Sequence, residues 1–492
     1  MAAEPPQSFH PIQEEPAKPK AKTRVALRIG VFFDGTGNNA SNTAAGMACG
    51  AQHPLQAEDL AASCQPYMSD PDSSYGNDVT NVFKLFDRYH APEELKGSGE
   101  QKLAYRKLYI EGIGTQAGEK DSTIGAGMGR GDTGVEGRVQ LSFEQIKVEV
   151  RLFQQANPDC EINSLTFDVF GFSRGAAAAR HFANQLVRGK QGPLGEVLRS
   201  NANAFGRSFI EQYQRDINMG FIGLFDTVAS IAGLSNLGNV SSAIAPGLKL
   251  YLSPKYFSKV VHLVARDECR GNFPLSQVKP DHMEISLPGV HSDIGGGYRA
   301  EAEECLLVSP MQALTVAKGC DVKTTSIYRD ALQAKALWLA KGWPAAMLTV
   351  VTPPATPLPA DPQDRQAPRQ QRVYAGLQLK RPVRGELSRV YLRVMYELAK
   401  QQGVQFDAIE DSDPNYALPA ELQPLCGRFI AGDYSITPTE EALLRLRYIH
   451  VSAHWNHPLG KRGNSGLKIV YINAPTADAV RIQHPHVAEW TL

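Results

Sequence analysis

The stretch that decides the fold is residues 165–180, LTFDVFGFSRGAAAAR, in which an apolar run leads through a Gly-x-Ser-x-Gly turn into an alanine-rich helix. The two glycines, at positions 171 and 175, leave room for neighbouring backbone to approach a very tight turn. Such a turn holds the Ser173 hydroxyl above the edge of a sheet, and the following helix directs its first N–H groups toward it. The pattern predicts that Ser173 is a nucleophile and that the Arg174 N–H stabilises an oxyanion.

Short β-rich runs alternate with helical patterns on both sides of this turn. Strands are predicted at residues 25–33, 107–111, 164–170, 220–225, 259–264 and 284–287, and helices at 137–156, 174–187 and from 387 to about 403. Several of the strands are apolar on both faces, which is typical of a parallel sheet covered by helices. We therefore expect an α/β-hydrolase-like, mostly parallel sheet flanked by helices, with insertions and a C-terminal helical or mixed region.

Two proline-rich stretches suggest how the chain is divided. Residues 1–24 contain five prolines and a single aromatic residue, so a flexible tail is expected there. Residues 351–372 contain six prolines, which favours an exposed loop or linker. The expected units are a catalytic domain at 25–350 and a C-terminal region at 373–492 that packs on or completes it.

Composition excludes several classes of function. The chain has 492 residues with 51 Lys and Arg against 51 Asp and Glu, and this zero net charge gives no reason to expect nucleic acid as a partner. No apolar run reaches the length of a membrane span, and the acidic, proline-rich start is unlike a signal peptide. The seven cysteines are scattered without a Cys-x-x-Cys pair, which indicates a reducing compartment at synthesis and argues against a zinc ribbon.

A serine nucleophile needs a histidine base and a carboxylate that orients it. In α/β-hydrolases the acid and then the histidine follow the serine along the chain. His291 fits the base, because it follows an apolar run and lies in a glycine-rich loop. Asp226 and Asp267 each end a predicted strand downstream of Ser173, where ligand sites of α/β sheets form, so both remain candidates for the acid.

Five motifs together resemble the DUF2235 hydrolases. They are VFFDGTGNN at 31–39, YIEGIGT at 109–115, GFSRG at 171–175, FDTV at 225–228 and PGVHSDIGGGY at 288–298. Within that group the chain looks most like the Tle1 branch of type VI secretion lipase effectors, which are antibacterial phospholipases injected into rival cells. The resemblance covers about residues 25–300.

The resemblance implies a role for each motif. It selects Asp226 as the acid of a Ser173–Asp226–His291 triad and leaves Asp267 as a structural carboxylate. It also places the first motif in the oxyanion hole, with the N–H of Gly35 as the first candidate donor and that of Asp34 as the second. A plain turn is the alternative reading of this glycine-rich loop. No cofactor and no metal are implied.

By the same resemblance the chain is an antibacterial serine phospholipase A that cleaves membrane glycerophospholipids through an acyl-enzyme intermediate. Its expected partners are a VgrG-type secretion spike or adaptor and a cognate immunity protein. We expect synthesis in the bacterial cytoplasm and type VI delivery into the periplasm of target cells. The alternatives are a serine esterase acting on a soluble or polymeric ester, and a non-enzymatic cargo protein of the spike.

Residues 227–248 form a run of 22 residues without a charge. Val228, Ile231, Leu234 and Leu237 recur in it every three or four residues, like one stripe of a helix. This character predicts a lid or the wall of an acyl groove beside the triad. A segment packed between the sheet and neighbouring helices would look the same.

A glycine-rich stretch resembles a phosphate-binding loop at first sight. The glycine-rich stretch 123–137 lacks the end of a phosphate-binding P-loop, so we expect a mobile loop beside the cleft. Its Arg130 and the adjacent Arg138 either meet a lipid phosphate or are solvated loop charges, and the second is favoured.

His450, His454 and His457 have a spacing that would place them on one helix face and could bind a metal. The sequence Trp-Asn-His-Pro at 455–458 argues against a helix continuing through the third histidine. No metal is therefore expected there, and His450 is the alternative base if His291 fails.

Overall fold

The computed structural model describes residues 22–48, 76–97, 101–115, 134–229, 247–359, 368–455 and 473–488. Several sequence predictions fall outside these ranges. They concern most of the N-terminal tail, most of the glycine-rich stretch with Arg130, the residues Ile231, Leu234 and Leu237, and His457.

A six-stranded parallel sheet forms the centre of the molecule, in the order β2-β1-β3-β4-β5-β7. Its strands are β1 (Thr23–Phe33), β2 (Gln101–Ile110), β3 (Cys160–Phe172), β4 (Ile217–Phe225), β5 (Val260–Ala265) and β7 (Met283–Leu287). All six predicted runs lie in this sheet, so the predicted parallel α/β class is confirmed. The carboxyl ends of β3, β4 and β7 each lead directly into a motif loop.

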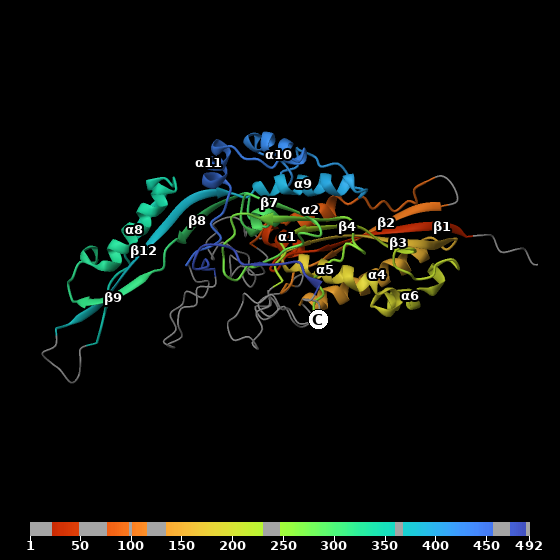
Figure 1. Cartoon of the computed structure of the whole chain (residues 1–492), viewed down its shortest axis with the longest axis horizontal. Coiled ribbons are helices and arrows are strands. Elements are labelled where there is room, and N and C mark those ends of the chain that lie inside the picture. The colour runs from red at the N-terminus through yellow and green to blue at the C-terminus, as the bar shows by residue number, and fades with distance from the viewer. Residues whose placement is uncertain are drawn as a thin grey trace, which may run out of the picture.

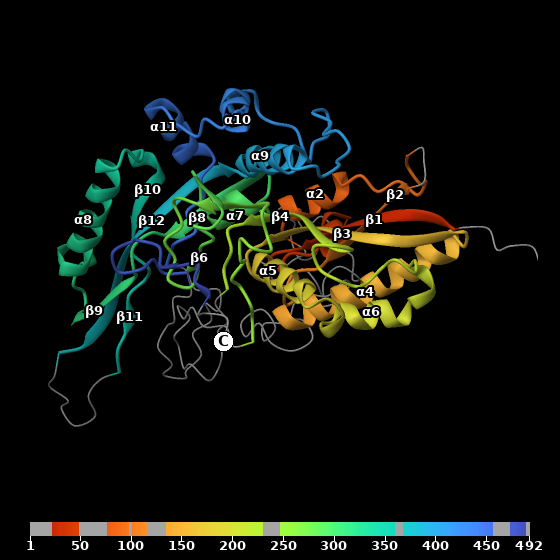
Figure 2. The ribbon, with the colours of Figure 1, turned by 45° about the vertical axis from the view of Figure 1, so that its right-hand side comes forward.

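Helices cover both faces of the sheet (Figures 1 and 2). On one face lie α4 (Val135–Ala156), α5 (Arg174–Val187) and α6 (Leu194–Ser200), and on the other lie α2 (Asn81–Arg88) and α9 (Leu387–Gln401). Two hydrophobic cores correspond to these faces, and the second also takes in α10 (Gln423–Ile430) and α11 (Pro438–Arg447). The helices α9, α10 and α11 therefore pack directly on the central parallel sheet.

The remaining elements near the sheet are short. Helix α1 (Ala40–Ala48) follows the loop after β1, and α7 (His291–Gly295) follows the loop after β7. Strand β6 (Leu275–Ser276) pairs in parallel with β13 (Gln483–His484), which brings the C-terminal part of the chain back to the main sheet.

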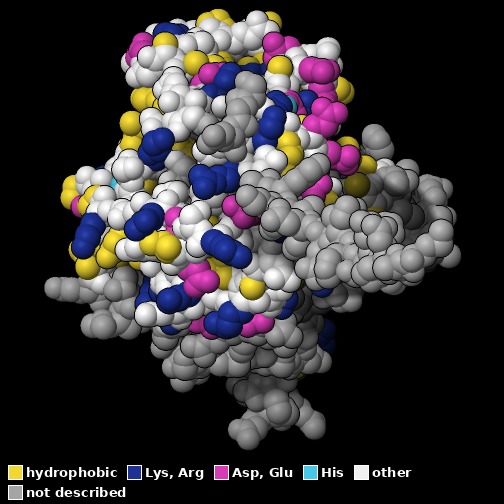
Figure 3. All heavy atoms as spheres, turned by 90° about the vertical axis from the view of Figure 1, so that its right-hand side faces the viewer, with side chains coloured by type: hydrophobic (Ala, Val, Ile, Leu, Met, Phe, Trp, Pro, Cys, Tyr) yellow, Lys and Arg dark blue, Asp and Glu magenta, His cyan; other side chains and the backbone are white. Residues whose placement is uncertain are grey.

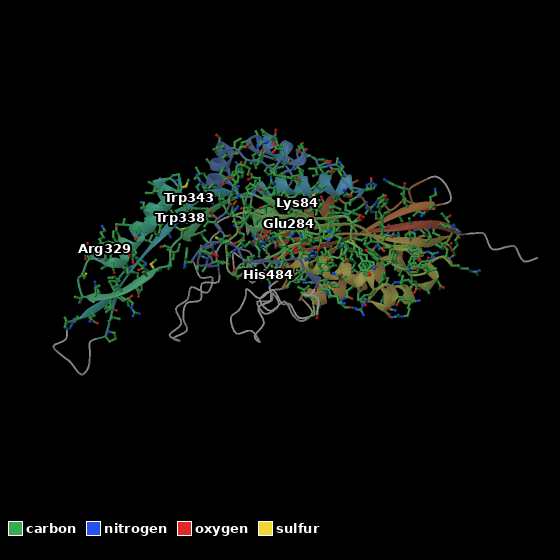
Figure 4. The ribbon with its side chains drawn as sticks, viewed as in Figure 1. Lys84, Glu284, Arg329, Trp338, Trp343 and His484 are labelled. Atoms are coloured by element: carbon green, nitrogen blue, oxygen red, sulfur yellow. The ribbon has the colours of Figure 1, made fainter. Side chains whose placement is uncertain are left out.

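A second, antiparallel sheet forms an arm that projects from the central sheet (Figure 1). Its long strand β12 (Gln370–Arg384) pairs with β8 (Glu301–Leu307), β9 (Gln312–Ala317), β10 (Leu348–Val351) and β11 (Thr356–Pro357). Helix α8 (Ser326–Ala340) packs on one face of this sheet. Trp338 and Trp343 lie together in the arm, with their ring centroids 5.0 Å apart (Figure 4).

The proline-rich stretch at 351–372, predicted as an exposed loop or linker, falls inside this arm, and its described residues from 352 to 357 are exposed. Strands β10 and β12 pair across it, and β11 lies within it, so the described residues show no division of the chain there. Proline is tolerated in a short edge strand such as β11, so the prolines here do not require a boundary between domains. Directly after this stretch, the burial of Val373, Ala375, Leu377 and Leu379 at every second position follows the pattern of a strand, β12.

Charges of both signs are mixed on the surface. The face in Figure 3 shows Lys and Arg side chains interspersed with Asp and Glu among its described residues, in keeping with the zero net charge. Within the part of the chain that the structure describes, no helix is both long and apolar enough to cross a membrane.

One ion pair is buried within the sheet. Asp168 of β3 is fully buried, and its carboxylate accepts two hydrogen bonds from the guanidinium of Arg28 in β1, at 2.6 and 2.8 Å. The hydroxyl of Tyr89, at the end of α2, donates to the same carboxylate at 2.9 Å. This group connects two neighbouring strands with a covering helix.

We expect Asp168→Asn to lower the free energy of unfolding by about 3 kcal/mol, because Arg28 then loses its compensating charge. Urea denaturation measures this change. The control is Glu149→Gln, since Glu149 lies 3.6 Å from Arg106 near the surface, and its cost should stay below about 1 kcal/mol. Equal losses in the two variants would show that the buried pair stabilises the fold no more than a surface pair does.

Candidate active site

The Gly-x-Ser-x-Gly turn lies between the end of β3 and the start of α5. Ser173 has φ 58° and ψ −125°, a strained conformation for a residue with a side chain. A Cβ on Gly171 would lie 2.5 Å from the Gly175 carbonyl oxygen, and one on Gly175 would lie 2.3 Å from that of Asp34. Both glycines are therefore required, Gly171 because the turn folds back on its own backbone and Gly175 because the turn packs against the end of β1 and the loop that follows it.

Three predicted residues meet at this turn. Ser173 Oγ lies 2.8 Å from His291 Nε2, and His291 Nδ1 lies 2.5 Å from Asp226 Oδ2. His291 is the first residue of α7, and Asp226 directly follows β4. All three side chains are buried. The geometry is that of a nucleophile, a base and an orienting acid.

Asp267, the other candidate acid, makes a different set of contacts. Its carboxylate accepts the Gly289 N–H at 2.7 Å and pairs with the neighbouring Arg266. Gly289 lies two residues before His291, so Asp267 holds the loop that carries the histidine. Its side chain is partly exposed, in contrast to that of Asp226.

Arg481 is a partner of Asp226 that sequence reasoning missed. Its guanidinium donates to Asp226 Oδ1 at 2.7 Å and to Oδ2 at 2.8 Å, and the Ala265 N–H donates to Oδ1 at 2.9 Å. Burial alone would raise the pKa of Asp226, but Arg481 and His291 outweigh burial and hold this pKa far below its usual range. Asp226 is therefore ionised across the working pH range. No local pattern marks Arg481, which lies 255 positions along the chain from the acid.

Aromatic rings and a second buried carboxylate surround His291. The rings of Phe172 and Phe273 lie 4.6 and 4.8 Å from the imidazole, measured between centroids. The His291 backbone N–H donates to Glu268 at 3.3 Å. Glu268 is buried, yet its pair with Arg270 lowers the pKa of Glu268 to about 2. The inward orientation of Glu268 cannot be read from the sequence, because it depends on how the fold packs around the residues after β5.

The pKa of His291 lies below its ordinary value. Burial is the largest cause, Asp226 opposes it, and the positive charges of Arg270 and Arg481 lower the pKa further. The imidazole is thus neutral near pH 7 and can accept a proton from Ser173.

A histidine and a glutamate support the turn behind Asp226. His262 Nε2 accepts the Thr227 N–H at 2.9 Å, and His262 Nδ1 lies 3.2 Å from Glu284 Oε2. His262 is fully buried. Glu284 belongs to β7 of the central sheet (Figure 4). This pair fixes the residue after Asp226, whose own φ of 42° is unusual for a residue with a side chain.

The loop after β1 differs from its predicted role. The Asp34 N–H, the second candidate for the oxyanion donor, is occupied instead by the Ile110 carbonyl, to which it donates at 3.0 Å as part of the sheet. The Gly35 N–H donates to the Asp34 carboxylate at 2.6 Å, so it reaches an oxyanion only by leaving that partner. Thr80 and Tyr109 donate to the same carboxylate, and burial raises the pKa of Asp34 to about 6.

Arg174 begins α5, so its N–H belongs to the first turn, where helix donors lack an intrahelical acceptor. Val228, the described member of the predicted lid stripe, is buried, and its N–H donates to the Ser173 carbonyl at 3.3 Å.

Arg138 is not a solvated loop charge, and that prediction is wrong. It is buried in the first turn of α4 and donates to the carbonyl oxygens of Gly112 and Thr115. The arginine therefore supports the second motif loop. Its place just inside the helix made it look like part of the glycine-rich stretch.

His450 belongs to a separate pair. Its Nδ1 lies 2.7 Å from Asp293 Oδ1, and its ring stacks on Tyr298 with centroids 3.6 Å apart. Among the described residues, no group of three or more His, Cys, Asp or Glu side chains is arranged to hold a metal. His454 is described, but the third histidine of the spacing is not.

The pH dependence of Ser173 reactivity follows from this geometry. Labelling by a fluorophosphonate probe should become faster as the pH rises and His291 loses its proton, with a midpoint below 6.5, the ordinary histidine pKa. Rates measured from pH 4 to pH 9 test this, with Ser173→Ala as the unlabelled control. A midpoint above 6.5 would contradict the assignment of the base.

Part of the chain matches a known protein family. Residues 188–317 match the family described as T6SS phospholipase effector Tle1-like, catalytic domain. This range includes Asp226 and His291 and begins after Ser173. A search among curated proteins found no match.

Among solved structures, the chain is similar to one described as the Tle1 effector bound to the VgrG spike from the type 6 secretion system. The TM-score is 0.72 at 29% identity, covering 98% of each chain. An uncharacterized protein from Pseudomonas aeruginosa has a TM-score of 0.37 at 17% identity, covering 87% of this chain and 53% of that one, which is too distant to carry an argument. The resemblance to the Tle1-like type VI secretion phospholipase effectors is therefore confirmed, by the catalytic-domain match and by a fold shared with a Tle1 effector along almost the whole chain.

Proposed function

We propose that this protein is an antibacterial type VI secretion effector that cleaves acyl esters of membrane glycerophospholipids as a serine phospholipase A. The observation that carries the proposal is the hydrogen-bonded series Ser173–His291–Asp226 at a strained Gly-x-Ser-x-Gly turn. The Tle1-like fold adds the substrate class, because the matched family consists of phospholipase effectors.

The reaction follows from the positions of these groups. His291 Nε2 takes the proton of Ser173 Oγ as the oxygen attacks the ester carbonyl carbon. The tetrahedral oxyanion forms near the first turn of α5, where the Arg174 N–H and the helix dipole favour negative charge. His291 then gives the proton to the departing alcohol oxygen of the lysophospholipid. His291 next takes a proton from a water molecule as that water attacks the acyl carbon, and it returns this proton to Ser173 Oγ when the bond between the acyl carbon and Oγ breaks and the fatty acid leaves.

The partners follow from the same likeness. The similar Tle1 effector was solved bound to a VgrG spike, and we propose a spike of this kind as the carrier of the present chain. Delivery would bring the protein into the periplasm of a target cell, where both membranes offer substrate. A producing cell exposed to sister cells would need a cognate immunity protein.

Release of fatty acid from phospholipid vesicles tests the proposed function. The wild-type protein should release fatty acid, and Ser173→Ala should abolish release because no other group replaces the nucleophile. A folded wild-type protein that hydrolyses a short soluble ester but not vesicles would favour the esterase alternative. Inactivity on both substrates would favour a non-enzymatic cargo protein.

The choice of acid has its own test. Asp226→Asn should lower kcat by about 10³–10⁴-fold, because the amide disrupts the tautomer and orientation of His291. Asp267→Asn is the matched comparison and should cost far less, since Asp267 holds only the preceding loop. A loss at Asp267 equal to or larger than that at Asp226 would reverse the assignment.

A further inference from the structure

The catalytic acid is held by a residue from a distant part of the chain. Arg481 bonds both oxygens of Asp226 and also donates through Nε to the Phe273 carbonyl oxygen at 2.8 Å. Its segment is fixed beside the main sheet, where the Leu275 N–H donates to the Ile482 carbonyl at 2.9 Å and β13 pairs with β6. Arg481 is itself buried.

The two-pronged contact determines how the carboxylate is oriented. A guanidinium that donates to both oxygens lies in the carboxylate plane and resists its rotation. Oδ2 is the oxygen that faces His291 Nδ1, so rotation of the Asp226 carboxylate would move the hydrogen bond that orients the imidazole. The Ala265 N–H contacts only Oδ1 and leaves this rotation open.

We propose that Arg481 is a positioning residue for the reaction, which acts through Asp226 to hold His291 against Ser173. The segment at 473–488, and not the hydrolase sheet alone, would then complete the triad. This inference rests on the proposed function in one respect, namely that these three residues carry out the hydrolysis.

Charge gives the inference a signature that a purely structural contact would lack. The groups that face His291 are Ser173 and Asp226, the buried Glu268 with its partner Arg270, and Arg481. Behind Asp226 lies the neutral His262 with Glu284.

Of the two arginines near His291, Arg270 is paired with Glu268 and stays in place when Arg481 is replaced. Loss of the Arg481 charge should therefore raise the pKa of His291 and move the acid limb of the pH profile to higher pH.

The first experiment compares Arg481→Met with Arg481→Lys on a short soluble ester. In Arg481→Met we expect kcat to fall about 10–10²-fold with little change in KM, and the acid limb to move to higher pH. Arg481→Lys keeps the charge but not the paired geometry, so the acid limb should return toward wild type while kcat recovers only in part. The control, Arg266→Met, removes an arginine paired with Asp267 and Glu441 outside the triad, and should leave both values unchanged.

The second experiment asks whether Arg481 acts through Asp226. In an Asp226→Asn background, adding Arg481→Met should lower kcat by less than a further threefold, because the carboxylate that Arg481 positions is already lost. Additive losses would overturn the proposal, and so would an unshifted acid limb or an unchanged kcat in Arg481→Met.

A cavity beside Arg481 offers a third test that works if the Met variant folds poorly. Arg481 lines a cavity of about 470 Å³ together with Glu268, Lys279 and Glu284. Methylguanidinium at millimolar concentration should restore part of the lost rate to Arg481→Ala, with no effect on Asp226→Asn. Absence of any rescue in a folded Arg481→Ala protein would count against the positioning role.

Failure of the proposed function would be recognised separately. If the wild-type protein hydrolyses only soluble esters, the phospholipase proposal fails and all three experiments still decide the role of Arg481. If it hydrolyses no ester, the rate of fluorophosphonate labelling of Ser173 replaces kcat, since this rate depends on the activated serine alone. Wild-type labelling rates in Arg481→Met would then overturn the proposal.

Discussion

Much of this fold is arranged around one buried negative charge, the carboxylate of Asp226. Asp226 is fully shielded from solvent, and a carboxylate in such a place persists only if positive charge and N–H donors surround it. The structure supplies His291 from the loop after β7, Ala265 from the end of β5 and Arg481 from just before β13. Each of these partners comes from a different part of the chain, so satisfying this one charge requires much of the fold to be in place.

The C-terminal helices support the same site from the opposite side. Tyr391 of α9 donates its hydroxyl to the Pro288 carbonyl in the loop before His291. Asn81 of α2 donates to the carbonyls of Ile294 and Ser388 at 2.9 and 2.8 Å, and so bonds α7 to α9. His291 therefore begins a short helix that is held between the sheet and a layer of helices that includes α9 from the second half of the sequence.

What could be predicted from the sequence was local. The six parallel strands, α5 and the position of Ser173 follow from runs of apolar residues and from two glycines, because these patterns act over a few residues. Arg481 could not be found this way, since only the folded chain brings it to Asp226. The antiparallel arm could not be predicted, because its strands pair residues far apart in the sequence, and the burial of Arg138 could not be predicted because burial is a property of the whole fold. The Gly35 N–H was expected at the oxyanion, but the bond to its own neighbour Asp34 cannot be inferred from glycine spacing.

The long strand β12 gives the arm a particular mechanical character. Its 15 residues extend for about 50 Å, pairing first with β9 and β11 and then with β8 and β10, before α9 begins. At the junction, Gly385 packs so closely on Arg299 that a Cβ would lie 2.4 Å from its carbonyl oxygen. The arm is thus joined to the rest of the molecule by a continuous strand and not by a flexible linker. A force applied at the far end of the arm would be transmitted along β12 into α9, the helix that supports the His291 loop.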